Sequence, residues 1–192
     1  LLGAPPLGVQ TMVYFKPPGS RGQALHQDQH YLATRPGTCA AAWMALERVD
    51  EANGCIRLVP DSGRFPTLAH GDADTHDSFT PVGVTLDGPA PTIPIVMDPG
   101  DVLFFGGQII HGSRPNHTPD RFRRAMIGHY VGADTDTIGH YFVPAVGFDG
   151  AQVDLGINDA QGPRGRWFSG KSWRAVVDHD GSVQHLGRTP AT

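Results

Sequence analysis

The segment at residues 123–130 reads Arg123-Arg124-Ala125-Met126-Ile127-Gly128-His129-Tyr130 and alternates in character from one residue to the next. Side chains of a β-strand point alternately to its two faces, so one face would carry Arg123, Ala125, Ile127 and His129. Apolar side chains on the same face as an arginine and a histidine indicate a strand that turns this face inward. The segment therefore predicts a β protein with polar groups inside it.

Short strands joined by turns extend from this segment in both directions. The chain has 25 glycines and 17 prolines, and long patterns with the 3.6-residue period of a helix are scarce. The candidate strands are Val9–Phe15, Thr38–Leu46, Cys55–Val59, Thr92–Met97, Asp101–Phe105, Arg123–Val131 and His140–Val143, with one more in the segment from Lys171. Seven or more short strands without intervening helices predict a mostly-β sandwich or barrel.

Length and composition limit the class of protein and its partners. The 192 residues, 39% of them hydrophobic, fit a single domain over residues 1–192. The formal net charge is −4 and no run of Lys or Arg is present, so we expect no nucleic-acid partner. No apolar stretch reaches the ~20 residues that span a bilayer, so we expect no membrane partner. These properties favour a small-molecule substrate and leave the oligomeric state open.

The cysteines and the first residues indicate the setting of the chain. Cys39 and Cys55 are too few for a disulfide scaffold and are not a close pair. A reduced cytoplasmic location is therefore expected, although a single bridge between the two stays open. The chain opens at Leu1 without an initiator methionine, and we expect it to lack the N-terminal part of a longer protein.

Two segments supply a candidate metal site. In Leu25-His26-Gln27-Asp28-Gln29-His30-Tyr31, His26 and Asp28 are two residues apart and would point to the same side of a strand. In Gly106-Gly107-Gln108-Ile109-Ile110-His111-Gly112-Ser113, His111 is expected to end a hydrophobic strand and lies between glycines. Two imidazoles and one carboxylate form the facial triad of non-haem iron(II) oxygenases. Taken alone, a His-x-Asp pair is also common on ordinary protein surfaces.

Arg123 adds an anion-binding group to this candidate site. Its strand begins shortly after His111, and His129 lies on the same inward face. A buried guanidinium needs an anionic partner. A dicarboxylate would supply one through a bidentate contact that lysine cannot reproduce. The sequence therefore indicates an organic acid bound inside the barrel.

A set of spaced motifs then runs in order from about Gln10 to Tyr130. The motifs are Lys16-Pro17-Pro18-Gly19, His26-Gln27-Asp28-Gln29-His30-Tyr31, Ala42-Trp43, Glu51-Ala52-Asn53-Gly54-Cys55, Pro99-Gly100-Asp101, His111-Gly112-Ser113, Pro115-Asn116 and Arg123-Arg124-Ala125. With these motifs the chain resembles the phytanoyl-CoA dioxygenase family of iron(II)/2-oxoglutarate-dependent oxygenases. The resemblance implies a double-stranded β-helix, the cupin-like jelly roll, with few short helices. It also implies Fe(II), O₂ and the cosubstrate 2-oxoglutarate.

The resemblance also implies roles for individual residues. His26, Asp28 and His111 would bind iron and form the catalytic centre. Arg123 would bind the C5 carboxylate of 2-oxoglutarate, and Ser113, two residues past the distal histidine, would be the hydroxyl partner of that carboxylate.

Further candidates for cosubstrate contact lie on two predicted strands. Gln10 and Tyr14 share a face of Val9–Phe15, a strand on which the family places cosubstrate contacts, and Trp43 matches a position beside the cosubstrate. The alternative for Tyr14 and Trp43 is ordinary core packing. His30 is expected to face the same side as the metal ligands and to support them or line the substrate pocket.

The chain departs from the family's pattern at two places. Many relatives carry a histidine where Pro60-Asp61-Ser62-Gly63 has Gly63. The spacing from the distal histidine to Arg123 is one residue longer than in some relatives, which leaves Arg121 and Arg124 as rival anion-binding residues. The aspartate ligand that halogenases of this superfamily lack is present, which disfavours halogenation.

These features predict a dioxygenase that hydroxylates a small organic metabolite and releases succinate and CO₂. Two alternatives stay open: a catalytically inactive jelly-roll protein that binds metal or ligand, and a cupin-like metal enzyme that does not use 2-oxoglutarate. The polar segments Arg64–Asp77 and Gly156–Gly170 lack apolar periodicity and are expected to form a mobile lid over the open end of the barrel.

Overall fold

A six-stranded antiparallel sheet is the larger of two layers in this computed structural model, which describes residues 1–158, 174–177 and 183–186. Its strand order is β13-β12-β1-β10-β3-β8. The strands are β1 (Pro6–Lys16), β3 (Ala40–Ala45), β8 (Val102–Gly106), β10 (Arg123–Gly132), β12 (Ala145–Val146) and β13 (Gln152–Val153).

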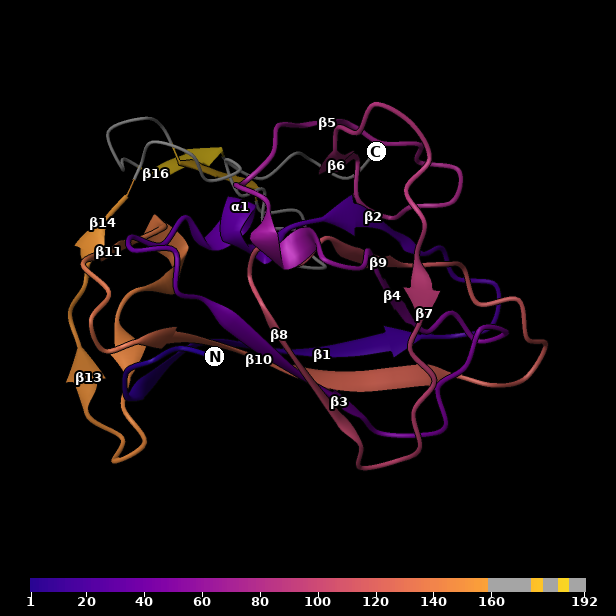
Figure 1. Cartoon of the computed structure of the whole chain (residues 1–192), viewed down its shortest axis with the longest axis horizontal. Coiled ribbons are helices and arrows are strands. Elements are labelled where there is room, and N and C mark those ends of the chain that lie inside the picture. The colour runs from indigo at the N-terminus through magenta and orange to yellow at the C-terminus, as the bar shows by residue number, and fades with distance from the viewer. Residues whose placement is uncertain (159–173, 178–182, 187–192) are drawn as a thin grey trace.

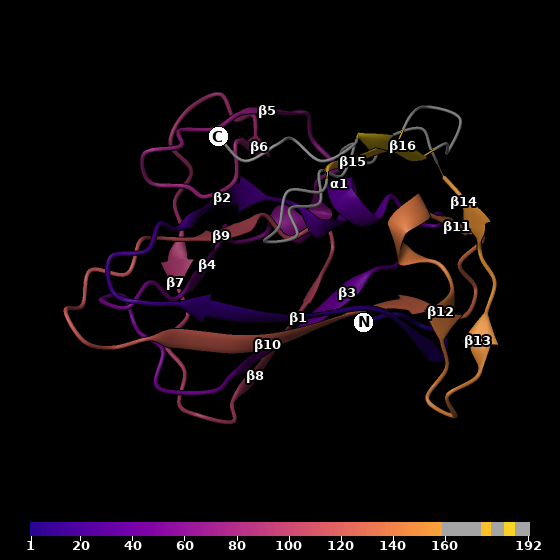
Figure 2. The same ribbon diagram turned by 180° about the vertical axis from the view of Figure 1, so that it is seen from behind.

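A smaller four-stranded sheet forms the second layer. Its order is β2-β9-β4-β7, with β2 (Gln23–His26), β4 (Ile56–Leu58), β7 (Ile93–Pro94) and β9 (His111–Ser113). Figures 1 and 2 show this layer lying over β1, β10 and β3. Two facing antiparallel sheets confirm the mostly-β prediction.

The remaining elements are short. Three two-stranded pairs combine β5 (His70–Asp72) with β6 (Val82–Val84), β11 (Thr137–Ile138) with β14 (Gly156–Ile157), and β15 (Arg174–Val177) with β16 (Val183–Leu186). The helical turns are α1 (Asp28–Leu32), η1 (Ser62–Arg64) and η2 (His140–Phe142). None of the helices in the described part of the chain is long and apolar enough to cross a membrane.

Most of the predicted strands are present, with shifted ends. The strand expected over Thr92–Met97 is limited to β7, and the one expected from Lys171 is seen as β15 within the described residues. The strand predicted over His140–Val143 is wrong, because this segment is the 3₁₀ turn η2. The backbone N–H of Phe142 donates to the carbonyl of Gly139 at 3.0 Å, which closes a turn that aromatic composition alone does not reveal.

The register of β1, β10 and β3 brings inward-facing residues into rows. Along β1, Met12, Tyr14 and Lys16 are more buried than the residues between them. Tyr14 pairs with Ala125 and Lys16 pairs with Arg123 across the β1–β10 ladder. The alternation expected for these strands is therefore present, and it directs polar side chains inward beside apolar ones.

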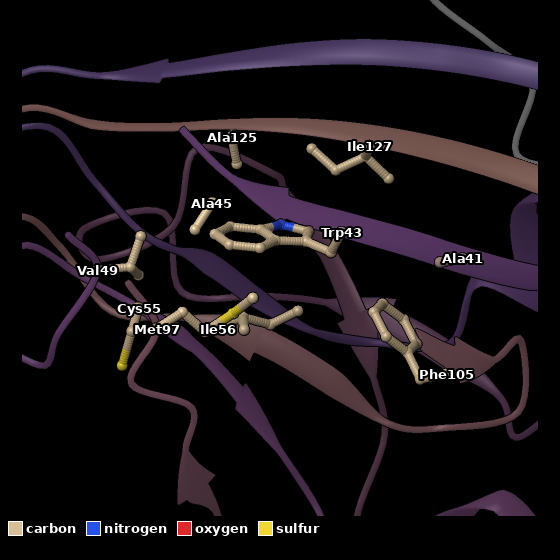
Figure 3. Packing of buried hydrophobic residues seen from close by; sticks show 10 residues of the cluster. All are labelled: Ala41, Trp43, Ala45, Val49, Cys55, Ile56, Met97, Phe105, Ala125 and Ile127. Carbon is tan, nitrogen blue, oxygen red and sulfur yellow. The ribbon is translucent and has the colours of Figure 1, made fainter. Parts of the chain in front are cut away.

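The main hydrophobic core lies between the two sheets. Figure 3 shows the Trp43 indole at its centre, with Ala125 and Ile127 on one side and Ile56 and Met97 on the other. Trp43 is 5% exposed. The core therefore fixes the distance between the sheets at the point where polar residues of both layers come together.

The two cysteines lie in different apolar clusters. Cys55 packs in the main core and Cys39 in a second cluster with Leu7 and Val131. Both thiols are buried and free, so the bridge that the sequence left open does not form.

Candidate metal and anion site

Two histidines face each other across β2 and β9. His26 ends β2, whereas His111 begins β9, so the prediction that His111 ends a hydrophobic strand is wrong. The two residues are register partners with ring centroids 4.2 Å apart. Nδ1 of His26 lies 2.9 Å from the carbonyl oxygen of Ala24, and Nδ1 of His111 lies 3.0 Å from that of Ile109. A carbonyl oxygen can only accept, so each Nδ1 carries the hydrogen and each Nε2 keeps its lone pair.

Asp28 reaches the same point from the start of a helix. The prediction that His26 and Asp28 share a strand is wrong, because β2 ends at His26 and Asp28 begins α1. Gln27 between them has an extended backbone (φ −115°, ψ 129°), so the two side chains still converge. Oδ1 of Asp28 lies 3.6 Å from Nε2 of His26 and 3.6 Å from Nε2 of His111.

The donor set fits a single divalent ion. The ligand-type atoms of His26, Asp28 and His111 lie within 4.8 Å of one another, and all three residues are buried. Ligands ~2.1 Å from one ion, at angles of roughly 90–120°, are ~3.0–3.6 Å apart, which matches the distances to Oδ1 of Asp28. Among the described residues this is the one such group of metal-type side chains. Two imidazoles and a carboxylate fit non-haem iron(II) and leave coordination positions open.

The protonation states of Asp28 and His111 suit a metal. Burial by itself would raise the pKa of Asp28, but the neighbouring imidazoles of His111, His129 and His26 lower it well below its ordinary value. Burial lowers the pKa of His111 to about 4, and Asp28 opposes this shift only in part. At neutral pH the carboxylate is therefore charged, and the His111 imidazole is neutral with its lone pair available.

His129 holds the second oxygen of Asp28. Its Nε2 lies 3.2 Å from Oδ2 of Asp28, and its side chain is buried, as the sequence predicts. A carboxylate oxygen accepts, so His129 donates to it. Oδ2 is thereby occupied while Oδ1 faces the two histidines, which fixes the orientation of the carboxylate.

Arg123 is buried without a carboxylate partner in the part of the chain that the structure describes. It is 5% exposed, its Nε has no hydrogen-bond partner there, and burial lowers its pKa to about 10. The guanidinium carbon lies 5.9 Å from the ring centre of Tyr14 and 5.5 Å from that of Trp43. A buried cation that contacts aromatic rings and has unused donors can accept an anionic ligand.

The rival arginines are engaged on the surface. Arg121 makes a bidentate pair with Asp50 at 2.8 and 2.9 Å. Arg124 pairs with Glu47, with its Nη2 2.7 Å from Oε2. The alternation of β10 turns Arg124 outward and Arg123 inward. Of these three arginines, Arg123 is therefore the one available to a ligand in the interior.

A cavity of about 340 Å³ joins the metal-type residues to Arg123. The eight residues predicted to bind the metal or the cosubstrate all line it: Gln10, Tyr14, His26, Asp28, Trp43, His111, Ser113 and Arg123. Burial raises the pKa of Tyr14, as does the charge of Asp28, so its phenol stays neutral at neutral pH. The structure thus brings these residues together, while their individual roles stay predictions.

His30 is placed differently from the prediction. It lies in α1, where successive residues turn by ~100°, so it does not share the side of Asp28 as it would on a strand. Its ring stacks on His70 with centroids 3.7 Å apart, and it is not among the residues that line the cavity.

Aromatic residues from distant segments were not identified from the sequence. Tyr31, Phe79, Tyr141 and Phe142 line the cavity and give it an apolar wall. Each comes from a helical turn or loop, so no periodic pattern marks it as facing inward.

Two polar residues near the ligands were also missed. The amide of Gln23 lies 3.3 Å from Nε2 of His26, the nitrogen that a metal would use. Lys16 is 4% exposed, and burial, with Arg123 nearby, lowers its pKa to about 7. The signal for Lys16 is the alternation of β1, since it lies two residues beyond Tyr14 on the inward face.

The loop at Gly63, where the chain departs from the family's pattern, supports the distal histidine. Its neighbour Ser62 is fully buried and donates its hydroxyl to the carbonyl of Val59 at 2.7 Å. The same hydroxyl accepts the backbone N–H of Ile110 at 2.8 Å. Ile110 directly precedes His111, so this serine fixes the backbone that presents the histidine.

With this geometry established, comparisons with known proteins identify the family. The sequence profile described as phytanoyl-CoA dioxygenase (PhyH) matches residues 1–125, more than half of the chain. The chain belongs to the phytanoyl-CoA dioxygenase family. The peroxisomal phytanoyl-CoA dioxygenase of Rattus norvegicus is 33% identical over 136 residues, which cover 67% of this chain and 40% of that protein. Phytanoyl-CoA dioxygenase 1 of Oryza sativa subsp. japonica is 33% identical over 136 residues, covering 66% and 45%. The chain thus spans less than half the length of these relatives.

Solved structures of other non-haem enzymes have a fold similar to that of this chain. SnoN, a non-haem alpha-ketoglutarate-dependent epimerase from nogalamycin biosynthesis, is 25% identical with a TM-score of 0.56, over 69% of this chain and 50% of that chain. The non-haem monooxygenase ThoJ is 25% identical with a TM-score of 0.59, over 72% and 53%. The predicted jelly roll is therefore confirmed. The predicted enzyme class, a non-haem iron/2-oxoglutarate-dependent dioxygenase, agrees with the family and with SnoN.

Proposed function

We propose that this chain is the catalytic core of an iron(II)- and 2-oxoglutarate-dependent dioxygenase that hydroxylates a small organic molecule. One observation carries the proposal: a buried His-Asp-His group and a buried arginine without a carboxylate partner, among the described residues, line the same cavity. The first fits iron(II), and the second fits a dicarboxylate.

The residues of the metal group hold the ion and fix its ligands. His26 and His111 offer Nε2 lone pairs because each Nδ1–H donates a hydrogen bond to a backbone carbonyl. Asp28 offers Oδ1 while His129 holds Oδ2. Bound iron(II) would let O₂ oxidise a C–H bond of the substrate to C–OH as 2-oxoglutarate is converted to succinate and CO₂.

The opposite side of the cavity binds the cosubstrate's far carboxylate in this proposal. Arg123 supplies a planar pair of N–H donors and Ser113 a hydroxyl. Tyr14 and Trp43 pack near the guanidinium, keep water from it and limit its movement. Gln10 lines the cavity on the same strand as Tyr14 and supplies a further polar contact.

The substrate would occupy the space bounded by the aromatic wall. Tyr31, Phe79 and Phe142 present mainly apolar surface to the cavity. A volume of about 340 Å³ must hold both the cosubstrate and the reacting part of the substrate. We therefore propose that the oxidised part of the substrate is compact and mostly apolar.

The decisive experiment measures succinate. The protein is loaded with iron(II) under nitrogen, mixed with 2-oxoglutarate, and exposed to air with and without candidate small molecules. Stimulation of succinate formation by one compound, with a hydroxylated product seen by mass spectrometry, supports the proposal. Binding of both ligands without succinate would favour an inactive binding protein, and turnover without 2-oxoglutarate would favour the cupin-like alternative.

The cellular setting stays a prediction. Free, buried Cys39 and Cys55 are compatible with the reduced cytoplasmic location expected from the sequence. Several relatives are named as peroxisomal, and a protein without disulfide bridges could also be located there. Fractionation of cells that produce the full-length protein would separate the two locations.

A further inference from the structure

The ammonium group of Lys16 is enclosed by three oxygen acceptors. Its Nζ lies 2.6 Å from the carbonyl oxygen of Arg114, 3.0 Å from Oγ of Ser113 and 3.5 Å from the carbonyl oxygen of Gly54. A lysine ammonium has three N–H donors and no acceptor. Each donor therefore has a protein partner, and Lys16 is not among the residues that line the cavity.

The neighbouring backbone is shaped around this group. Gly54 has φ of +78°, and a Cβ there would lie 2.5 Å from the carbonyl oxygen of Arg114 and 3.0 Å from Nζ of Lys16. A side chain at position 54 would thus push against the ammonium and one of its acceptors. The close approach of three chain segments to Lys16 depends on this glycine.

Ser113 receives two donors on one hydroxyl oxygen. Lys16 Nζ donates to Oγ at 3.0 Å, and the backbone N–H of Gln23 donates to it at 3.2 Å. A serine hydroxyl has two acceptor lone pairs and one hydrogen. With both lone pairs used, the hydrogen must point away from Lys16 and Gln23, and Ser113 can act only as a donor to a further group.

Ser113 shares a cavity with the arginine that is proposed to bind an anion. Ser113 lines the cavity, and so does Arg123, which is the register partner of Lys16 across β1 and β10. The carboxylate that Arg123 would bind can only accept hydrogen bonds, so it needs a serine that donates. A serine free to rotate would spend part of its time with a lone pair toward the anion.

We infer that Lys16 is a positioning residue for the cosubstrate: it occupies a lone pair of Ser113 and so commits the serine hydroxyl to donate to the far carboxylate of 2-oxoglutarate. The inference rests on the proposed function, because it assumes that this carboxylate lies at Arg123. Lys16 itself makes no contact with the ligand and acts through Ser113.

The test compares binding of two 2-oxo acids. Dissociation constants of 2-oxoglutarate and of 2-oxobutanoate, which lacks the far carboxylate, are measured by calorimetry on the iron(II)-loaded protein under nitrogen. The pH is set about one unit below the shifted pKa of Lys16, so that the ammonium is charged. Lys16→Met keeps most of the length of the side chain, one atom short of lysine, and removes the donors. We expect the substitution to weaken binding of 2-oxoglutarate about tenfold and to leave the affinity for 2-oxobutanoate unchanged.

A double-mutant cycle separates positioning from general damage. In a Ser113→Ala background, Lys16→Met should have little further effect on 2-oxoglutarate, because the residue through which it acts is gone. Arg124→Met, on the outward face of the same strand as Arg123, is the matched control and should leave both constants unchanged. If Lys16→Met does not fold, Lys16→Leu, which also removes every donor to Ser113, should give the same difference between the two ligands.

Three results would overturn the inference while the proposed function stands: unchanged 2-oxoglutarate affinity in Lys16→Met, equal loss for both acids, or additive losses in the double variant. If the wild-type protein itself does not bind 2-oxoglutarate, the proposed function fails and this inference fails with it.

Discussion

Asp28 uses its two oxygens for different contacts, and this division is the basis of the first prediction. Oδ1 faces His26 and His111, whereas Oδ2 accepts from His129. Asp28→Ala should abolish substrate oxidation and weaken iron(II) binding, because it removes the only anionic ligand of the group. Asp98→Ala, at an exposed aspartate, is the control and should leave both unchanged. Full activity in Asp28→Ala would refute the metal assignment.

The second prediction concerns the residue that orients this carboxylate. His129→Leu should weaken iron(II) affinity roughly 10–100-fold, the usual cost of losing a hydrogen-bond partner behind a metal ligand. His129→Gln retains an N–H donor and should recover most of the affinity. Competition with a chromophoric chelator measures both variants. Equal losses in the two would mean that His129 acts through packing alone.

Arg123 carries the third prediction. Arg123→Lys keeps a charge but loses the planar pair of donors, and a loss of about 2–5 kcal/mol in 2-oxoglutarate binding is expected for a buried ion pair. Arg121→Ala should matter little, because Arg121 pairs with Asp50 near the surface. Saturation curves for succinate formation against 2-oxoglutarate compare the two variants. A reversed order would place the cosubstrate elsewhere.

Individual residues of the candidate site were accessible from sequence to different degrees. Arg123 could be predicted because alternation along its strand and the Arg-Arg-Ala motif agree. The pairing of Arg121 and Arg124 with surface carboxylates could not, since Asp50 and Glu47 are far from them in the sequence. Lys16 was missed because lysine is rarely buried, although its strand position pointed inward.

At the scale of elements, α1 is where the sequence argument and the structure differ most. A helix of five residues is too short to show the 3.6-residue period, so His26-Gln27-Asp28 reads as a continuous strand. The predicted convergence of His26 and Asp28 is nevertheless correct, because one residue with an extended backbone, Gln27, follows the strand. The predicted position of His30 is wrong, because His30 lies two residues after Asp28 in the helix and its side chain points to a different side.

Gln27 links this turn to the segment that was expected to form a lid. Its amide nitrogen donates to the carbonyls of Pro66 and Gln108 at 3.1 and 2.9 Å, and its amide oxygen accepts the N–H of Leu68 at 2.7 Å. Gln27 is fully buried. The segment Arg64–Asp77 is therefore attached beside the metal group and contains β5. Whether it moves over the substrate stays a prediction, as does any role of Gly156–Gly170, most of which lies outside the described residues.

The fourth prediction tests this attachment. Gln27→Leu removes the partner of three partly buried backbone groups and should lower the free energy of unfolding by about 2 kcal/mol, since a group left unsatisfied away from water costs about 1–3 kcal/mol. Substrate turnover should fall more than 2-oxoglutarate affinity, because Arg123 and Ser113 lie on the sheets. Urea unfolding and calorimetry give the two quantities, and Gln152→Leu on exposed β13 is the control. Equal losses in turnover and in 2-oxoglutarate affinity would argue against a substrate-side role.

At the scale of the whole molecule, the two sheets serve the core and the site at once. Trp43 packs at the centre of the core (Figure 3). It also lines the cavity beside Arg123. The sequence predicted the mostly-β fold because short candidate strands lie between turn signals and patterns with the 3.6-residue period are scarce. It did not predict β5, β6 or the pairing of β11 with β14, which involve short segments whose strand form depends on their partners.

The interior also contains a destabilising group that the proposed function would explain. Arg123 is buried among Tyr14, Trp43 and Lys16 without an anion among the described residues. Desolvation of an unpaired guanidinium opposes folding, whereas an apolar side chain of similar length would not. Bound 2-oxoglutarate would offset this cost by supplying the missing charge.

The last prediction follows from this balance. Without ligand, Arg123→Met should unfold at the same temperature as the wild type or higher, because it removes an unpaired buried charge. With iron(II) and 2-oxoglutarate at ~100 times the dissociation constant, the wild type should gain about 2.7 kcal/mol and unfold several degrees higher, while Arg123→Met should gain little from 2-oxoglutarate. Thermal melts under nitrogen measure this, and Arg124→Met should respond to the ligand like the wild type. A destabilised Arg123→Met that still gains the full ligand shift would show that Arg123 serves the fold and not the cosubstrate.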